Sequence, residues 1–330
     1  MHRLKAMALA AATLVSACKI ALAEDEGLGV PLDCEPGVTC FFQQYADMQN
    51  GKGVVDPFCG KAAYEGHRGS DIRVPSMPDI EKSVPVLAVA DGIVRAIRDG
   101  EEDHPVRKKS EWPRFKDKHC GNGAIIDHNG GLQSQYCHLR KGSMRVRRGD
   151  HVEKGEAIGQ VGSSGMAAFP HLHISIRKDG ETIEPFTGKP VGSGCLKSGG
   201  DPLWSKAALD FFDKASTHVM ALGMAGRPPD YDKLMPEGPP PDLKAGDRAT
   251  VGWGWFLNLE KGDRLHFKIT APDGSTYTET ETKPLGRHKA AYMQFAGRGR
   301  SPAKGDWTLQ ITLKRDGAVV ETRTKTVTVR

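Results

Sequence analysis

The sequence lacks the residue spacings of the common zinc motifs. None of its seven cysteines forms a CxxC pair, so a zinc site built from cysteines is not expected. The helical HExxH pattern that many metalloproteases share is also absent. If the chain binds a metal, the ligands must therefore come from separate segments of the sequence.

The sequence also lacks long hydrophobic runs and a strong excess of charge. Beyond the first 23 residues, no apolar run approaches the ~20 residues that a membrane span needs. The formal net charge is +5, and three of these positive charges are Arg3, Lys5 and Lys19. The remaining excess is too small to indicate nucleic-acid binding. The locally basic segment 104–119 is interpreted as a solvated loop.

The first residues have the pattern of an export signal. A short basic start, an apolar stretch and an Ala-Leu-Ala site predict a signal peptide over residues 1–23, cleaved after Ala23. An alternative is that VSAC, ending at Cys18, is a lipoprotein box and Cys18 carries a lipid anchor. Both alternatives predict an exported protein.

The cysteines that remain after residue 23 predict disulfide bonds, because their number is even and the chain is expected to be exported. One pair follows from the local pattern. Residues 121–139 resemble a hairpin around the turn Asn129-Gly130-Gly131, which brings Cys120 and Cys137 to facing ends of adjacent strands. The cysteines in question are Cys34, Cys40, Cys59, Cys120, Cys137 and Cys195.

A chain of 330 residues is expected to hold two domains, and the pattern predicts a mainly β protein. Residues 24–62 form a disulfide-tied leader, and 63–188 show short strands between glycine turns. Residues 189–244 contain a helix and a Pro-rich linker. Residues 245–330 alternate apolar and polar positions between turns, which predicts an Ig-like β-sandwich.

The sequence also predicts one helix and one further hairpin. Apolar residues recur every four positions in 201–223, which predicts a helix capped by Asp201 with Pro202 in its first turn. The turn signal Asp91-Gly92 between two alternating segments predicts a hairpin in addition to the one at 129–131.

A cluster of candidate metal ligands emerges from three of the β segments. In FPHLHISIR, His171 and His173 are two residues apart, so they share one face of a strand. GHRGSD supplies His67 and Asp71 from a loop and strand, and QYCHLR supplies His138 at a strand end. A catalytic zinc takes three N or O ligands and keeps one position open. Two histidines and Asp71 would meet this need; an ordinary His67–Asp71 ion pair and a structural His138 are the simpler alternatives.

These motifs together resemble the lysostaphin-type (LytM-like) zinc metalloendopeptidases. The resemblance covers about residues 60–188 and is carried, in order, by GHRGSD, VPVLAVADGIVRAI, CGNGAIIDHNGGLQSQYCHL, VRRGDHVEKGEAIGQVGSSG and PHLHI. It implies an antiparallel β-sheet groove with a metal at its floor. The chain departs from the common pattern at Phe169-Pro170, at Ile174-Ser175 and in a charged insertion over 99–119.

The resemblance also implies the roles of the candidate residues. One Zn²⁺ is expected on His67, Asp71 and His173. His171 is expected to act as general base or hydrogen-bond partner, and His138 to stabilise an oxyanion or to protonate the leaving amine.

The expected activity is zinc-dependent hydrolysis of peptide bonds in peptidoglycan stem peptides or cross-links, in a Gram-negative periplasm. Two alternatives remain open. One is a non-enzymatic wall-binding or hydrolase-activating module, and the other is an exported zinc peptidase that acts on proteins.

Overall fold

The structure, a computed structural model, describes residues 26–197 and 200–330. The expected signal peptide, with Cys18, lies outside the described residues. Within those residues no helix is both long and apolar enough to span a bilayer. The elements are β1 (Phe41–Gln44), β2 (Ser70–Arg73), α1 (Met77–Ile80), β3 (Pro85–Leu87), β4 (Gly92–Arg98), η1 (Lys109–Phe115), β5 (Asn122–Asp127), η2 (Asn129–Gly131), β6 (Leu132–Leu139), β7 (His151–Val152), β8 (Ala157–Gln160), β9 (His171–Lys178), β10 (Glu181–Glu184), β11 (Lys189–Pro190), α2 (Lys206–Ala215), β12 (Val219–Ala225), α3 (Tyr231–Glu237), β13 (Thr250–Leu259), β14 (Arg264–Thr270), β15 (Thr276–Glu281), β16 (Lys289–Arg298), β17 (Gly305–Arg315) and β18 (Ala318–Val329).

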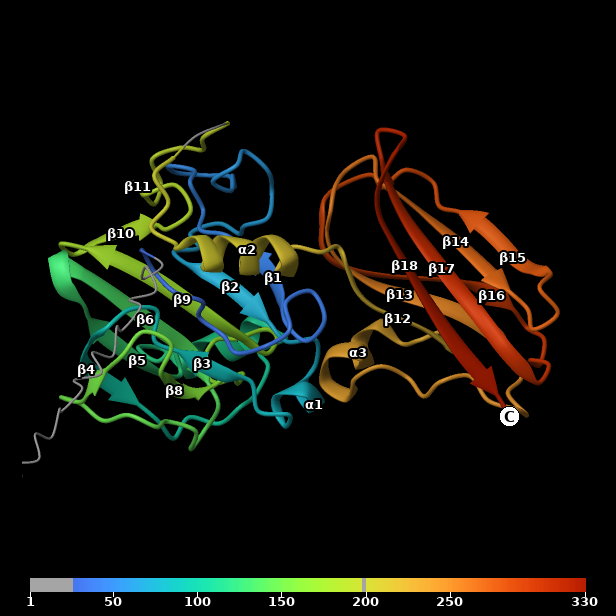
Figure 1. Cartoon of the computed structure of the whole chain (residues 1–330), viewed down its shortest axis with the longest axis horizontal. Helices are drawn as coiled ribbons and strands as arrows, with labels where there is room; N and C mark the ends of the chain where they lie inside the picture. Colours follow the sequence, from blue (N-terminus) through green and yellow to red (C-terminus); the bar gives the residue numbers. More distant parts are fainter. Residues whose placement is uncertain (1–25, 198–199) are drawn as a thin grey trace, which may run out of the picture.

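A large antiparallel sheet forms the first half of the molecule (Figure 1). Its strands run in the order β1-β2-β9-β6-β5-β4-β7, and β10 and β11 extend it beside β9. The leader contributes directly, because β1 pairs with β2. The predicted mainly β class with an antiparallel sheet is confirmed.

Strand β9 shows why this sheet has one polar face. Leu172, Ile174 and Ile176 are each no more than 1% exposed and belong to the hydrophobic core. The alternate residues of β9 therefore point to the opposite face. Those residues are His171, His173, Ser175 and Arg177.

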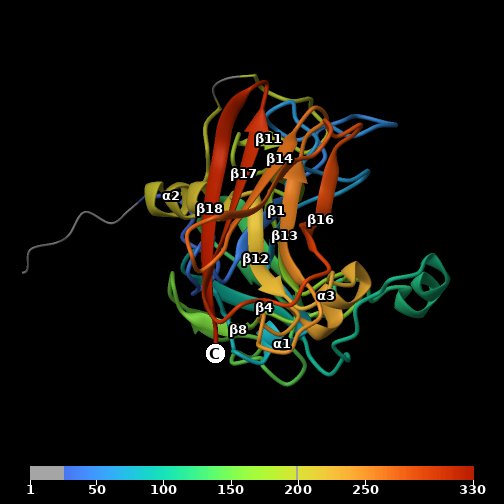
Figure 2. The same cartoon turned by 90° about the vertical axis from the view of Figure 1, so that its right-hand side faces the viewer.

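Two further sheets form the C-terminal β-sandwich, which faces the viewer in Figure 2. One contains β12-β13-β16 and the other β15-β14-β17-β18. Strand β13 is buried on both sides: Phe256 lies in the core between the two sheets, whereas Trp253 and Trp255 pack in a cluster with Phe41 of β1. The sandwich therefore docks on the leader strand of the first sheet through aromatic side chains.

The prediction of a helix over 201–223 is wrong at both ends, because α2 covers only Lys206–Ala215. Helix α2 begins after Ser205, whose hydroxyl accepts from the Ala208 amide, so the cap is not Asp201. The segment from Val219 to Ala225 is strand β12, paired with β13. The apolar residues keep their four-residue spacing past the end of the helix by coincidence. Pairing with β13 makes the segment Val219–Ala225 a strand.

The two predicted hairpins have different outcomes. Strands β5 and β6 pair around Asn129–Gly131 as predicted. Strands β3 and β4, on either side of Asp91-Gly92, do not pair with each other. Strand β3 pairs with β8, whereas β4 pairs with β5 and β7, so the turn separates two sheets.

Three disulfides link the six cysteines that follow the expected signal. The predicted Cys120–Cys137 bond is confirmed. The others are Cys34–Cys40 and Cys59–Cys195, which are separated by 6 and 136 residues. The long-range bond joins the leader to the segment after β11.

Removal of the long-range disulfide is expected to destabilise the protein. In the chain-entropy model, a loop of this length contributes up to about 5 kcal/mol to the free energy of unfolding. Thermal unfolding of the Cys59→Ser/Cys195→Ser variant should therefore occur at a clearly lower temperature than in the wild type. Cys34→Ser/Cys40→Ser, which opens a short loop, is the matched control and should cost less. Equal losses in both variants would contradict this expectation.

Candidate metal centre in the groove

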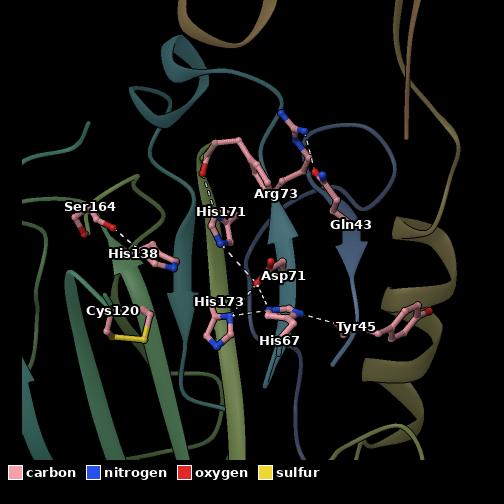
Figure 3. A network of polar contacts seen from close by, with 12 residues as sticks. Gln43, Tyr45, His67, Asp71, Arg73, Cys120, His138, Ser164, His171 and His173 are labelled. Atoms are coloured by element: carbon pink, nitrogen blue, oxygen red, sulfur yellow. Dashed lines mark hydrogen bonds and ion pairs between the residues drawn. A yellow bond between two sulfur atoms is a disulfide. The ribbon is translucent and has the colours of Figure 1, made fainter. Parts of the chain in front are cut away.

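His67, Asp71 and His173 converge on one point at the floor of the first sheet (Figure 3). Asp71 Oδ1 lies 3.0 Å from His67 Nε2 and 2.9 Å from His173 Nδ1. The two ring nitrogens are 3.1 Å apart. The structure thus brings together the three residues that the resemblance implies as ligands, from a loop, β2 and β9.

Strand register and a glycine create this convergence. Asp71 and His173 are direct partners in the β2–β9 ladder, so their side chains leave the sheet on the same face. The loop that carries His67 passes close over His173 at Gly69. A Cβ on Gly69 would lie 2.5 Å from the Ile174 carbonyl oxygen and 2.7 Å from the His173 ring. The second glycine of GHRGSD is therefore required by close packing.

The hydrogen bonding of His67 directs its Nε2 at the carboxylate. His67 Nδ1 lies 2.6 Å from the Tyr45 carbonyl oxygen, which can only accept, so Nδ1 carries a proton. Nε2 faces Asp71 Oδ1 at a distance that needs either a proton on Nε2 or a metal cation between the two atoms. A hydrogen bond from the outer ring nitrogen to a backbone carbonyl is typical of metal-bound histidines.

The electrostatics of the cluster also favour a cation. Burial opposes ionisation of Asp71, but the imidazoles of His67, His171 and His173 around its carboxylate hold its pKa well below the usual range. Burial likewise opposes protonation of His67, but Asp71 and the Tyr45 carbonyl raise its pKa. The ionised Asp71 carboxylate therefore favours a proton on a neighbouring imidazole or, in place of that proton, a metal cation.

The donor set fits zinc. Ligand atoms of a tetrahedral zinc, with bonds of about 2.0–2.2 Å, lie about 3.3–3.5 Å apart, close to the spacing found between the three atoms. Two nitrogens and one carboxylate oxygen are typical ligands of a catalytic zinc. The His173 side chain is 17% exposed, so the cluster opens to the groove.

A β-bulge turns His138 toward this cluster. Cys137 pairs with His173, so a regular strand would point the next residue, His138, to the other face. The β5–β6 register shifts here, and His138 adopts a left-handed φ of 64°. Gly123 permits the close approach, because a Cβ there would lie 2.1 Å from the Tyr136 carbonyl oxygen. As a result, the His138 ring centroid lies 4.6 Å from that of His171.

His138 and His171 both present a free Nε2. His138 Nδ1–H donates to the Ser164 carbonyl and His171 Nδ1–H to the Phe169 carbonyl, each over 2.8 Å. Burial lowers the pKa of both, and repulsion by any positive charge on His171 or His173 lowers that of His138 further. The neutral form of each ring is therefore favoured, and a neutral ring can accept a proton at Nε2. His171 Nε2 is 3.6 Å from Asp71 Oδ1, so it lies beside the candidate ligands.

Beyond this cluster the polar face of the sheet is hollowed into a groove of about 580 Å³. His138, His173, Met166 and Arg177 are among the residues that line it. His119 and Cys120, at the end of the charged insertion, also line it. The insertion therefore borders the groove, as expected.

The C-terminal sandwich contacts the strand that carries Asp71. Arg73 is buried, and its guanidinium lies between the rings of Phe169, 4.6 Å away, and Trp255, 5.2 Å away. It donates to Gln43 Oε1 and the Pro75 carbonyl, both over 2.8 Å. Burial lowers the pKa of Arg73 to about 9. Sandwich and leader thus help to hold the segment that orients His171.

Comparison with known proteins identifies the class of the first domain. The sequence model of Peptidase family M23 matches residues 65–185. These residues form an M23 (LytM/lysostaphin-type) metallopeptidase domain, which agrees with the resemblance noted from the sequence. Members of this family depend on zinc, and the His67–Asp71–His173 group offers three ligand atoms that could hold such an ion.

Several curated proteins are similar over the same region. The chain is 31% identical over 121 residues to a DD-carboxypeptidase/endopeptidase, Mpg, of Neisseria meningitidis, with 36% of this chain and 22% of that protein covered. It is 29% identical over 125 residues to the peptidoglycan DD-endopeptidase ShyC of Vibrio cholerae, with 36% and 23% covered. The chain thus spans less than a quarter of the length of these relatives.

Solved structures give more distant matches. A zinc-containing peptidase from Vibrio cholerae has 20% identity and a TM-score of 0.31, with 48% of this chain and 39% of that chain covered. The catalytic domain of lysostaphin from Staphylococcus simulans has 20% identity and a TM-score of 0.27, with 43% and 86% covered.

Sequence reasoning missed two residues of the groove, Arg68 and Arg177. The signal for Arg177 was present: it is four residues after His173, so strand alternation places both side chains on one face. Arg68 follows His67 directly, but it lies in a loop, where no periodicity predicts a direction.

Metal content can separate the candidate ligands from their neighbours. We expect His173→Ala to lose its zinc, because it removes one of three donors, whereas His171→Ala should retain zinc and lose turnover. Inductively coupled plasma mass spectrometry of the purified variants measures this. Loss of the metal from His171→Ala, or its full retention in His173→Ala, would show that the roles are assigned wrongly.

Proposed function

We propose that the chain is a zinc-dependent endopeptidase that hydrolyses peptide bonds in peptidoglycan, at a D,D cross-link as its named relatives suggest. The observation that carries the proposal is the His67–Asp71–His173 group open to a groove, with two neutral imidazoles beside it. A structural zinc site would instead be closed by four protein ligands.

His67, Asp71 and His173 are the proposed zinc ligands. Zinc bound there would act as a Lewis acid on the scissile carbonyl and lower the pKa of a bound water to ~7. Tyr45 holds His67 in the tautomer that presents Nε2, and the β2–β9 register fixes Asp71 against His173. These contacts let the protein present its donor atoms with little rearrangement.

We assign proton transfer to the other two histidines. Each is neutral and has its Nδ1–H tied to a backbone carbonyl, so only Nε2 is free to accept a proton. His171 Nε2 lies near Asp71 Oδ1 and suits the general base, or a hydrogen-bond partner of the nucleophile. His138, on the neighbouring strand β6 with its ring centroid 4.6 Å from that of His171, suits the group that stabilises the oxyanion or protonates the leaving amine.

The remaining parts are assigned supporting roles. We propose that residues of about 63–188, together with the leader, form the M23 domain. The C-terminal sandwich packs on the leader strand. We propose that it binds the cell wall, binds a partner, or controls access to the groove. Disulfides suit an oxidising compartment, so we infer export, with the periplasm of a Gram-negative cell as the destination.

Digestion of purified peptidoglycan sacculi tests the activity. We expect residues 24–330 to release muropeptides whose masses show cleavage of cross-links, and a zinc chelator to abolish the release. His171→Ala, with zinc retained, is the matched control and should release far less.

Other outcomes favour the alternatives. A protein that holds one zinc but releases nothing would indicate a wall-binding or hydrolase-activating module. Chelator-sensitive cleavage of casein but not of sacculi would indicate a peptidase that acts on proteins.

A further inference from the structure

Two arginines give one part of the groove a positive charge that no acid in its lining balances. Arg68 and Arg177 both line the groove, and none of its lining residues is an aspartate or a glutamate. Among the described residues, neither arginine forms an ion pair. Arg177 also borders an adjacent hollow that Asp127 and Asp179 line, but it forms no ion pair with either of them.

Arg177 is held in place by neutral partners. Its Nη2 donates to Gln135 Oε1 over 2.7 Å and its Nη1 to Gln133 Oε1 over 3.3 Å. Gln133 is itself oriented by donation to Asp127 Oδ1 over 2.7 Å. A guanidinium has five N–H donors, so two bonds to amide oxygens orient the group but leave its charge uncompensated and most donors unused.

Arg68 adds a second positive charge to the same groove. It is exposed and has no hydrogen-bond acceptor among the described residues. Partial burial lowers the pKa of Arg177, and the charge of Arg68 lowers it further. Two like charges that face one groove repel each other, and an anion between them would relieve this repulsion.

We propose that Arg68 and Arg177 form a subsite that binds a free carboxylate of the substrate peptide. This rests on the proposed peptidase function and deepens it, because it names a chemical feature that the substrate must carry. Paired guanidinium groups suit a carboxylate, which accepts charge-assisted hydrogen bonds from such forks.

The position of the subsite relates it to the scissile bond. His173 and Arg177 lie on the same face of β9, four residues apart, which corresponds to roughly 13 Å along a strand. An extended peptide bound beside β9 covers this distance in about four residues. A carboxylate bound at Arg177 therefore belongs to a residue several positions from the cleaved bond, and the subsite selects peptides that are acidic there.

Matched acid and amide ligands test the proposal. Cross-linked stem-peptide dimers are made as pairs, in which one carboxyl group is free in the first member and amidated in the second, and each carboxyl group is tested in turn. A further acid and amide pair carries a hydroxyethylene isostere in place of the scissile amide, so that it binds without being cleaved. Full-length, zinc-loaded wild type, Arg68→Gln and Arg177→Gln are compared for kcat, KM and the Kd of the isosteres. Arg148→Gln removes the same charge from an exposed turn outside the groove and is the control.

We expect the wild type and Arg148→Gln to bind one free-acid peptide about tenfold more tightly than its amide, the effect of one charge-assisted hydrogen bond. The preference should disappear in Arg68→Gln and Arg177→Gln, mainly through KM, with zinc content unchanged. Arg68→Gln separates loss of the subsite from loss of the fold. The Arg68 side chain is exposed and has no hydrogen-bond partner among the described residues, so its replacement should leave the sheet intact.

Equal binding of every acid and amide pair, a preference that survives both substitutions, or no binding of any peptide would overturn the subsite. If the acid preference is found in Kd but no peptide is cleaved, the proposed activity fails while the subsite stands.

Discussion

The structure of the site depends on one buried carboxylate surrounded by imidazoles. Asp71 Oδ1 lies within 3.0 Å of nitrogens on both His67 and His173, and it is almost fully shielded from water. A buried anion is costly unless it is compensated, so the surrounding elements must deliver positive charge or a cation to this point. The β2–β9 register, the loop at Gly69 and the Tyr45 carbonyl all serve this requirement.

Strand β9 connects this requirement to substrate recognition. One of its faces supplies Leu172, Ile174 and Ile176 to the core, and this anchors the strand rigidly. The other face carries His171, His173 and Arg177 in one row, and His173 and Arg177 line the groove. A base, a ligand and an arginine therefore keep fixed spacings without depending on any loop. Such placement on a rigid element suits a site that must hold its geometry.

The sequence predicted what depends on local pattern and missed what depends on long-range packing. Alternation placed His171 and His173 on one face, and the hairpin at Asn129–Gly131 predicted Cys120–Cys137. The strand Val219–Ala225 was mistaken for helix because only its pairing with β13 decides its form. The direction of His138 was also not predictable, since a bulge reverses the alternation of β6. The motif resemblance supplied the ligand set, which spacing alone left open.

The most direct test is anomalous diffraction at the zinc edge from crystals of the zinc-loaded chain. We expect one anomalous peak within about 2.0–2.2 Å of His67 Nε2, Asp71 Oδ1 and His173 Nδ1, with the remaining position facing the groove. A zinc closed off by His138 or His171 as a fourth protein ligand, or no zinc at these atoms, would contradict the assigned roles of these residues.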